Sequence, residues 1–517
     1  MAAPSAGPRS AGRRRRRPQA APKHHRSVDY RNLTNPLIRQ PALFQDRVEA
    51  IHDTALRVLK ELGVRVLNAE ARKVLADAGA DVSEDTMMVR FDRELVSRAL
   101  HTAPQMFEVH GGSDGCSIKV GGNNLVFGPV GGPAFVSDLD GGKRTGTLEE
   151  LRILIKLAHS FDVIHLLSQS VEPQDVGLNV RHLQTTLSQL TLSDKVPFVY
   201  SRGSGQVHDC FEMIRIARGL SHEEFRARAW CHTVINTNSP RQLDVPMCQG
   251  ILDFARAGQM VIVTPFTLSG AMAPVTIPGA LTLQHAEALA GITLDQVVRP
   301  GAPVVYGSFT SNVDMRSGSP AFGTPEFVKG AFGAGELARH IGLPWRGSAA
   351  TASNAPDEQA VYETLMSAWG GVLGGINIMK HAAGWLEGGL TASKEKFILD
   401  VEMLQIIAEV LHPLDASDAE LGFDAIAATE PGGHFFAAQH TMERYRSAFY
   451  SPLLSDWRNF GEWSNDGAKT AVRRANEIWK STLAVFEAPV LCPSTEEALF
   501  EFVEQRSAEG GSPPLDE

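Results

Sequence analysis

Short apolar runs alternate with helix-like segments over most of this chain. The runs lie near residues 163–170, 197–201, 228–236, 259–264, 303–309, 344–348, 375–379 and 434–438. Parallel strands need a crossover connection of about a dozen residues, usually a helix. Eight such units predict an α/β fold, a (β/α)8 TIM barrel over residues 146–490. A doubly wound open sheet is the alternative, but no G-x-G-x-x-G motif follows the first run.

A helical region of residues 36–105 is predicted before the barrel. Apolar residues recur at helical spacing from residue 46 onwards, and Gly63 supplies a stop. Asn68 is the expected N-cap of a second helix that stops at Gly79, and Pro104 ends a third.

Residues 106–145 combine many glycines with short apolar runs, which predicts β-hairpins. Thr147 and Glu150 then have the spacing of a capping box, which predicts the start of the first barrel helix. Residues 491–517 are expected to form a polar C-terminal tail.

Basic residues are concentrated near the N-terminus, between Arg9 and Arg26. A run of like charges with Ala and Pro cannot bury a core, so residues 1–35 are predicted to be a disordered basic tail. A nucleic-acid arm or a transit peptide is the alternative for this segment. The chain as a whole carries a formal net charge of −10, which argues against nucleic acid as a partner of the folded body.

Five scattered cysteines without a C-x-x-C pair are typical of reduced cytoplasmic thiols. Residues 257–286 contain no Asp, Glu, Lys or Arg, and this uncharged stretch is long enough for a membrane-spanning helix. Pro265, Pro274 and Pro278 interrupt this run, so a buried strand followed by a loop is favoured. We therefore predict a soluble cytoplasmic protein without a membrane contact.

In a barrel of this type, reactive groups come from the carboxyl ends of the strands. The candidate side chains at these ends are Gln169, Tyr200, Arg202, Asn236, Phe266, Phe309, Arg316, Asn354, His381, Trp385, His434 and His440.

Several common chemistries find little support among these residues. The chain has no H-E-x-x-H motif. Zinc held by His381, His434 and a carboxylate is conceivable, but hydrogen-bonding roles are favoured for both histidines. We therefore predict that the protein binds no metal. There is no G-x-S-x-G motif either. The glycines at 370–375 follow a helix-like segment, which favours close helix packing over phosphate binding. A mostly neutral mouth suits a reaction in which the enzyme positions two reactants.

Five stretches of this sequence resemble a known family. They are GPVGGPAFVSDLDGGKRTGTLEEL, VINTNSP, NVDMRSGSPAFGTPE, GWLEGGLTASKEKFILDVEML and the segment 431–475. They look like the trimethylamine/glycine betaine corrinoid methyltransferase family, with a likeness from about Gln45 to Pro489. The resemblance implies a (β/α)8 barrel with an N-terminal helical region. It also implies methyl transfer from an amine to cob(I)alamin on a separate small corrinoid protein, so this chain alone would bind no cofactor.

The same resemblance gives a meaning to the segment ASNAPDEQA. In the trimethylamine enzymes this loop carries pyrrolysine, and the match at Asp357, Gln359 and Ala360 puts Asn354 at its position. The chain therefore resembles the non-pyrrolysine branch, whose known substrates are quaternary amines such as glycine betaine. A quaternary nitrogen leaves as a neutral tertiary amine, so attack by cob(I)alamin needs neither an acid nor an electrophilic cofactor.

Aromatic faces would bind such a cation by cation–π attraction of roughly 0.5–2 kcal/mol each. Trp385 is the best candidate, and Phe309 is a second. Tyr306 and Trp345 also lie near strand ends, but packing in the barrel core is favoured for both.

Polar candidates complete the predicted substrate site. Arg316 could bind a betaine carboxylate, with an ion pair to Asp314 as the equally weighted alternative. His381 and His434 could orient the substrate or the corrinoid, and Asn354 could donate an amide hydrogen bond. The expected partners are thus a quaternary amine and a small corrinoid protein, and a homo-oligomer is expected. A barrel methyltransferase for another methyl donor and a non-catalytic small-molecule binder stay open as alternative functions.

Overall fold

The computed structural model describes residues 28–515, so most of the predicted basic tail lies outside the described residues. The chain divides into two units. The main unit comprises Asp29–Pro413 and Pro452–Glu517, and the second consists of Leu414–Ser451 together with residues up to Val28. The two are described separately below.

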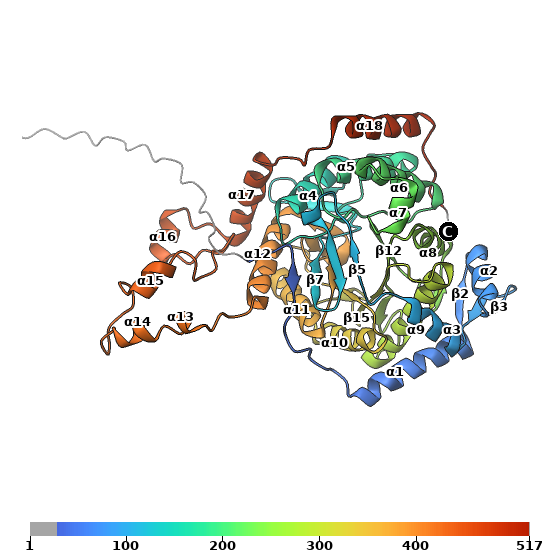
Figure 1. The fold of residues 1–517 in the computed structure, drawn as a ribbon, viewed down its shortest axis with the longest axis horizontal. Coiled ribbons are helices and arrows are strands. Elements are labelled where there is room, and N and C mark those ends of the chain that lie inside the picture. Colours follow the sequence, from blue (N-terminus) through green and yellow to red (C-terminus); the bar gives the residue numbers. More distant parts are fainter. Residues whose placement is uncertain (1–27, 516–517) are drawn as a thin grey trace, which may run out of the picture. The chain divides into compact units, whose positions relative to one another are not determined.

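A mostly parallel seven-stranded sheet forms the centre of the main unit (Figure 1). Its strands, in spatial order, are β1 (Leu33–Thr34), β7 (Asn124–Phe127), β18 (Ile378–Lys380), β17 (Trp345–Ser348), β14 (Val304–Gly307), β12 (Met260–Val263) and β10 (His232–Ile235). All neighbours pair in parallel except β1 with β7. The strands are short and almost entirely buried, as parallel strands covered on both faces must be.

Two further predicted strands are present only as isolated bridges. Leu166 pairs with Val196, and Phe198 pairs with His232 of β10, both in parallel. The backbone N–H of His165 also donates to the carbonyl of Phe127 in β7 at 2.9 Å. The segments 163–170 and 197–201 therefore lie where the sequence predicts strands, but without continuous ladders.

The eighth predicted strand, at residues 434–438, is wrong: the structure has a turn there. Its place next to β18 is taken by β7, in a segment predicted to contain only hairpins. The glycines that surround β7 hid it, because they are equally typical of hairpin turns. The fold class is α/β, as predicted.

Helices surround the central strands in Figure 1. Most of them follow a central strand, as crossover connections do. They are α4 (Leu148–Ser160), α5 (Leu178–Leu192), α6 (Ser204–Arg218), α7 (His222–Ala227), α8 (Val245–Ala257), α9 (Ile277–Val298), α10 (Pro325–His340), α11 (Glu358–Gly374) and α12 (Lys394–Leu411). The longest, α9, is buried along nearly its whole length because α1, α3, α8 and α10 also pack on it. No described helix is long and apolar enough to cross a membrane.

Three helices form the N-terminal region, at the positions expected: α1 (Gln45–Arg57), α2 (Ala69–Asp77) and α3 (Arg93–Thr102). The Asn68 side chain accepts from the N–H of Ala71 and caps α2. Gly63 ends the π-helical turn η1 (Val58–Leu62) with φ 75°, and a Cβ there would lie 2.5 Å from the carbonyl oxygen of Val89. The small sheet beside these helices was not anticipated; it contains β11 (Gln242–Leu243), β2 (Val64–Val66), β4 (Met88–Arg90) and β3 (Asp81–Ser83).

Two antiparallel strand pairs lie within residues 106–145. One joins β5 (Met106–Val109) to β6 (Ile118–Gly121), and the other joins β8 (Phe135–Asp138) to β9 (Gly142–Thr145). The second pair belongs to a four-stranded sheet with β20 (Thr391–Ser393) and β19 (Trp385–Leu386). This sheet connects the glycine-rich segment to the end of β18.

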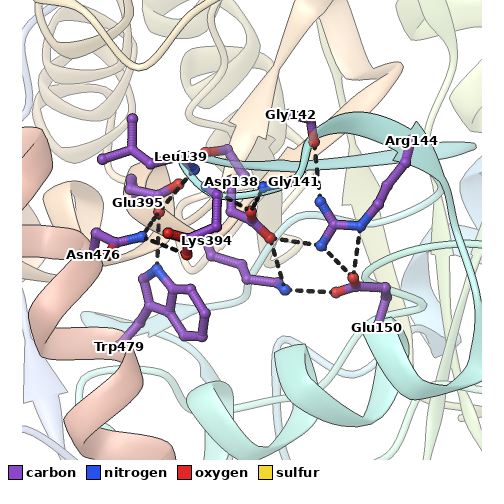
Figure 2. Close-up of polar contacts among 12 residues, drawn as sticks. Asp138, Leu139, Gly141, Gly142, Arg144, Glu150, Lys394, Glu395, Asn476 and Trp479 are labelled. Carbon is purple, nitrogen blue, oxygen red and sulfur yellow. Dashed lines mark hydrogen bonds and ion pairs between the residues drawn. The ribbon is translucent and has the colours of Figure 1, made fainter.

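A buried ionic cluster fastens this sheet to the neighbouring helices (Figure 2). Lys394, at the start of α12, lies 3.0 Å from Asp138 and 2.8 Å from Glu150 of α4. Arg144 of β9 binds the same two carboxylates. Thr147 caps α4 as predicted, but Glu150 does not complete the capping box, because its carboxylate faces these cations.

The C-terminal segment adds two helices to the main unit. The first, α17 (Ala471–Ala484), packs on α12 and α4, and α18 (Pro493–Ala508) packs on α5 and α6. The segment predicted as a polar tail therefore contains a helix, which buries Leu499 and Val503. The short helix α16 (Phe460–Asn465) precedes α17 in the sequence and belongs to the main unit. The second unit contains the short helices α13 (Asp418–Leu421), α14 (Phe423–Ala427) and α15 (Gln439–Arg444).

Candidate active site

A cavity of about 480 Å³ lies at the carboxyl ends of the central strands. Its lining comes from at least five of these strands or the residues directly after them, which is where barrel-type enzymes hold their reactive groups. The lining side chains include Ser168, Tyr200, Asn236, Phe266, Phe309, Arg346, Lys380, His381 and Trp385.

Aromatic rings form one wall of the cavity. Phe309 begins β15 (Phe309–Val313) and pairs with Phe266 at the start of β13 (Phe266–Ser269); their ring centroids are 5.0 Å apart. Trp385 lies 6.1 Å from Phe309, nearly perpendicular to it, and 4.1 Å from His381. The Trp385 indole N–H donates to the carbonyl of Thr351 at 3.1 Å, which holds the ring in one orientation. Such a cluster can hold a methylated cation against its faces.

His381 directly follows β18 and has a left-handed backbone conformation with φ 59°. Its Nδ1 lies 3.1 Å from the hydroxyl of Ser348, at the end of the adjacent strand β17. Burial, followed by the nearby charges of Arg346 and Lys380, holds the pKa of His381 well below its usual value. The imidazole is therefore neutral at physiological pH and positions groups rather than carrying charge.

Two buried basic side chains, Arg346 and Lys380, line the same cavity. Arg346 is 2% exposed, and burial lowers the pKa of its guanidinium to about 9, so it stays charged at neutral pH. Lys380 donates to the hydroxyl of Ser168 at 2.5 Å and lies 3.2 Å from Nε2 of His232. Burial and the charge of Arg346 hold the pKa of Lys380 well below its usual value.

Acidic groups and thiols are missing from the described lining of this cavity, which has no Asp, Glu or Cys. Within residues 28–515, no cluster of three or more His, Cys, Asp or Glu side chains could hold a metal ion. The prediction that the protein binds no zinc stays a prediction.

The sequence-derived candidates divide into two groups. Phe309, His381 and Trp385 line the cavity together, as do other strand-end candidates: Gln169, Tyr200, Asn236 and Phe266. Arg316 and Asn354 do not line it. Arg316 lies in an exposed turn where its backbone N–H donates to Asp314 at 3.2 Å, and Asn354 is exposed between β17 and α11. Both residues lie in loops that extend beyond the strand ends. The spacing of the strands in the sequence does not reveal how far such a loop reaches from the cavity.

His434 belongs to the second unit and not to the cavity described above. It lines a separate cavity of about 1030 Å³ together with His440, formed by residues 418–444 alone. The sequence places both residues at a strand end because it predicts the eighth strand at residues 434–438, where the structure has a turn.

Arg346 and Lys380 are the charged lining residues that sequence reasoning missed. Each stands within or directly after an apolar run, in PWRGS and GINIMK. A charged residue inside a buried strand is costly unless it has a function or a partner. That signal is readable in the sequence.

Comparisons with known proteins show the family of this chain. The family model described as trimethylamine methyltransferase matches residues 9–511. A glycine betaine methyltransferase of Desulfitobacterium hafniense is 34% identical over 471 residues, covering 91% of this chain and 98% of that protein. Trimethylamine methyltransferase MttB1 of Methanosarcina mazei is 30% identical over 441 residues, covering 84% of this chain and 88% of that protein.

Among solved structures, the hydroxylamine complex of MtmB has a similar fold, with a TM-score of 0.51 at 9% identity and 89% coverage of both chains. The sequence matches extend over nearly the whole length of both this chain and its relatives. This chain therefore belongs to the trimethylamine methyltransferase family.

Proposed function

We propose that this protein transfers a methyl group from a quaternary amine, glycine betaine or a related betaine, to cob(I)alamin on a small corrinoid protein. The observation that carries the proposal is the wall of Phe266, Phe309 and Trp385 in a cavity whose described lining has no acidic group. Aromatic faces attract a methylated ammonium group. The glycine betaine methyltransferase among the relatives supports the same substrate class.

The cavity suits attack on a methyl group that is already activated. Cob(I)alamin supplies the nucleophile, and the leaving group is a neutral tertiary amine, so this chain needs no general acid. Trp385 and Phe309 hold the ammonium group, and neutral His381 supports the Trp385 ring. The contribution of the chain is alignment, and well-oriented reactions gain on the order of 7–11 kcal/mol in this way.

The proposal extends to the architecture: the central strands close into an eight-stranded barrel. On the side of β7 that faces away from β18, the backbone N–H of His165 donates to the carbonyl of Phe127, which joins the segment 163–167 to β7. Leu167 then donates to Val196 at 2.9 Å, and Val199 donates to His232 of β10 at 3.0 Å. These bonds support a ring that begins at β7 and whose last helix is α12. Such a barrel begins and ends earlier than the predicted range 146–490.

The experiment combines this protein with a reduced corrinoid protein and follows methylcobalamin formation spectroscopically. Glycine betaine, proline betaine, carnitine, choline and trimethylamine are offered separately. Reaction with a quaternary amine and none with trimethylamine is the expected result. Reaction with trimethylamine alone contradicts the substrate class, and no reaction with any of them contradicts the assignment to quaternary amines.

Self-association is also proposed, because the second unit exposes large apolar side chains. Leu414 is 97% exposed, and Phe423, Phe436 and Phe449 are each at least 74% exposed. Helices as short as α13, α14 and α15 are unstable in water unless their apolar faces are covered. We propose that a second copy of this chain covers them.

A further inference from the structure

Arg346 is a buried cation without a polar partner. It lies inside the central sheet, opposite Gly307 of β14 and Ile378 of β18. Its Nε and Nη1 atoms are fully buried and form no hydrogen bond, and the side chain forms no ion pair with any described residue. The guanidinium group lies over the ring of Phe309 in a cation–π contact, with its central carbon 5.8 Å from the ring centroid.

A guanidinium carries five N–H donors, and leaving them unpaired in a buried site is strongly unfavourable. Arg144, by contrast, binds both Asp138 and Glu150. One Nη atom of Arg218 is also buried without a hydrogen bond, but Arg218 does not line the candidate substrate cavity, whereas Arg346 does. Buried polar groups without partners at such a place indicate a ligand.

Lys380 cannot substitute for Arg346 as a ligand donor, although it lines the same cavity. Its ammonium group already donates to the hydroxyl of Ser168 and lies within 3.4 Å of the Leu167 carbonyl. Arg346 gives the cavity a positive charge that no described lining residue compensates. Such a cavity repels a simple cation and accepts a molecule that brings its own negative charge.

Phe309 connects this positive end to the aromatic wall. Its ring faces Arg346 on one side and lies near Trp385 and His381, with centroid distances of 6.1 and 5.6 Å. A carboxylate at Arg346 therefore leaves the ammonium group of a short zwitterion close to the aromatic faces. The planar guanidinium also matches a carboxylate in a two-point hydrogen bond.

We propose that Arg346 binds the carboxylate of a zwitterionic substrate and thereby makes this cavity select betaines over cationic amines such as choline. The inference rests on the proposed function for the identity of the site, but it concerns binding alone. It assigns to Arg346 the carboxylate contact that sequence analysis assigned to Arg316.

Binding to the full-length protein, measured by calorimetry without a corrinoid protein, separates this inference from the catalytic proposal. Wild-type protein is expected to bind glycine betaine at least about 30-fold more tightly than choline or glycine betaine methyl ester, as for a buried charge pair. Equal affinity for the ester and the acid overturns the proposal. Tighter binding of phosphocholine than of any carboxylated betaine overturns the carboxylate assignment.

Variants test the residue itself. Arg346→Gln should lose about 30-fold or more in affinity for glycine betaine and should not lose affinity for choline. The matched control, Arg316→Gln, should bind glycine betaine within about twofold of wild type, because its side chain is exposed. Equal losses for both ligands in Arg346→Gln would assign the residue a structural role and overturn the inference.

The melting temperature distinguishes a residue that binds ligand from a residue that stabilises the fold. Arg346→Met removes an unpaired buried charge, so the ligand-free variant should melt at or above the wild-type temperature. It should also lose the rise in melting temperature that glycine betaine causes in wild type. A ligand-free variant that melts well below wild type would show that Arg346 stabilises the fold, and this would contradict the proposal. Because these measurements need no methyl transfer, inactivity in the corrinoid assay leaves their outcome intact.

Discussion

The rings of Trp385 and His381 lie 4.1 Å apart, inclined at 38°, directly after the carboxyl end of β18. The backbone conformations at His381 and at Gly384 fix the positions of the two rings. His381 has φ 59°, and Gly384 has φ 90° with its N–H bound to Asp400 at 2.8 Å. Asp400 is in turn paired with the buried Lys396. The indole is thus fixed before any ligand arrives, which lowers the entropic cost of binding a cation against it.

Replacing Trp385 tests this rigid aromatic face. Trp385→Leu keeps an apolar side chain but removes the ring, so the Kd for glycine betaine should rise about 2- to 30-fold, the equivalent of one cation–π contact. Trp385→Phe should retain most of the affinity. Trp457→Leu is the control, since Trp457 is 70% exposed and does not line the cavity. Isothermal titration measures all three, and unchanged affinity in Trp385→Leu would remove Trp385 from the binding site.

Asn354 offers a test of the loop between β17 and α11, where the resemblance described above implies the pyrrolysine position. The side chain is exposed and does not line the cavity, so Asn354→Ala should leave kcat/KM for the quaternary amine within about twofold of wild type. Steady-state methyl transfer to the corrinoid protein measures this. A loss of tenfold or more would mean that the loop moves onto the substrate during the reaction. Asn354 would then have the hydrogen-bonding role that sequence analysis assigned to it.

The ionic cluster around Asp138 should make stability depend on pH. Burial raises the pKa of Asp138, but hydrogen bonds from Arg144, Gly141 and Lys394 outweigh it and hold the pKa well below its usual value. The ionised carboxylate therefore stabilises the fold above its unfolded pKa of about 3.9, and this contribution is lost as the pH falls through the lower folded value. Asp138→Asn should cost about 3–5 kcal/mol at pH 7, because it breaks a buried pair.

Urea unfolding at pH 7 and near pH 3 measures this cost. The difference between Asp138→Asn and wild type should shrink at the lower pH. Asp53→Asn is the control; its pair with Arg93 is exposed and should contribute less than about 1 kcal/mol. A deficit in Asp138→Asn that is equally large at both pH values would show that packing, not charge, accounts for it.

Self-association should depend on the apolar side chains of the second unit. Sedimentation velocity is expected to show an oligomer for wild type and a dissociation constant at least about tenfold higher for Phe436→Ser combined with Phe449→Ser. Val275→Ser changes a side chain that is 69% exposed in the main unit and should leave association unchanged. If the double variant associates as strongly as wild type, these residues do not form the interface.

Local signals in the sequence determined much of the N-terminal half. Asn68 and Thr147 cap their helices as predicted, because an N-cap acts on backbone N–H groups only two or three residues away. The α/β class follows from the alternation of apolar runs with helical segments, and Phe309, His381 and Trp385 are identified because they lie at or within six residues of the ends of such runs. Short-range patterns are sufficient for these features.

Long-range pairing was decided by the tertiary structure alone. The glycine-rich segment around β7 became a neighbour of β18, about 250 residues further along the chain, whereas residues 434–438 did not become a strand. Whether a loop residue reaches the cavity depends on the path of its loop in space, so Arg316 fell outside and Arg346 inside. The absence of a partner for Arg346 is likewise a property of its three-dimensional surroundings, because burial and hydrogen bonding depend on every element packed around a side chain.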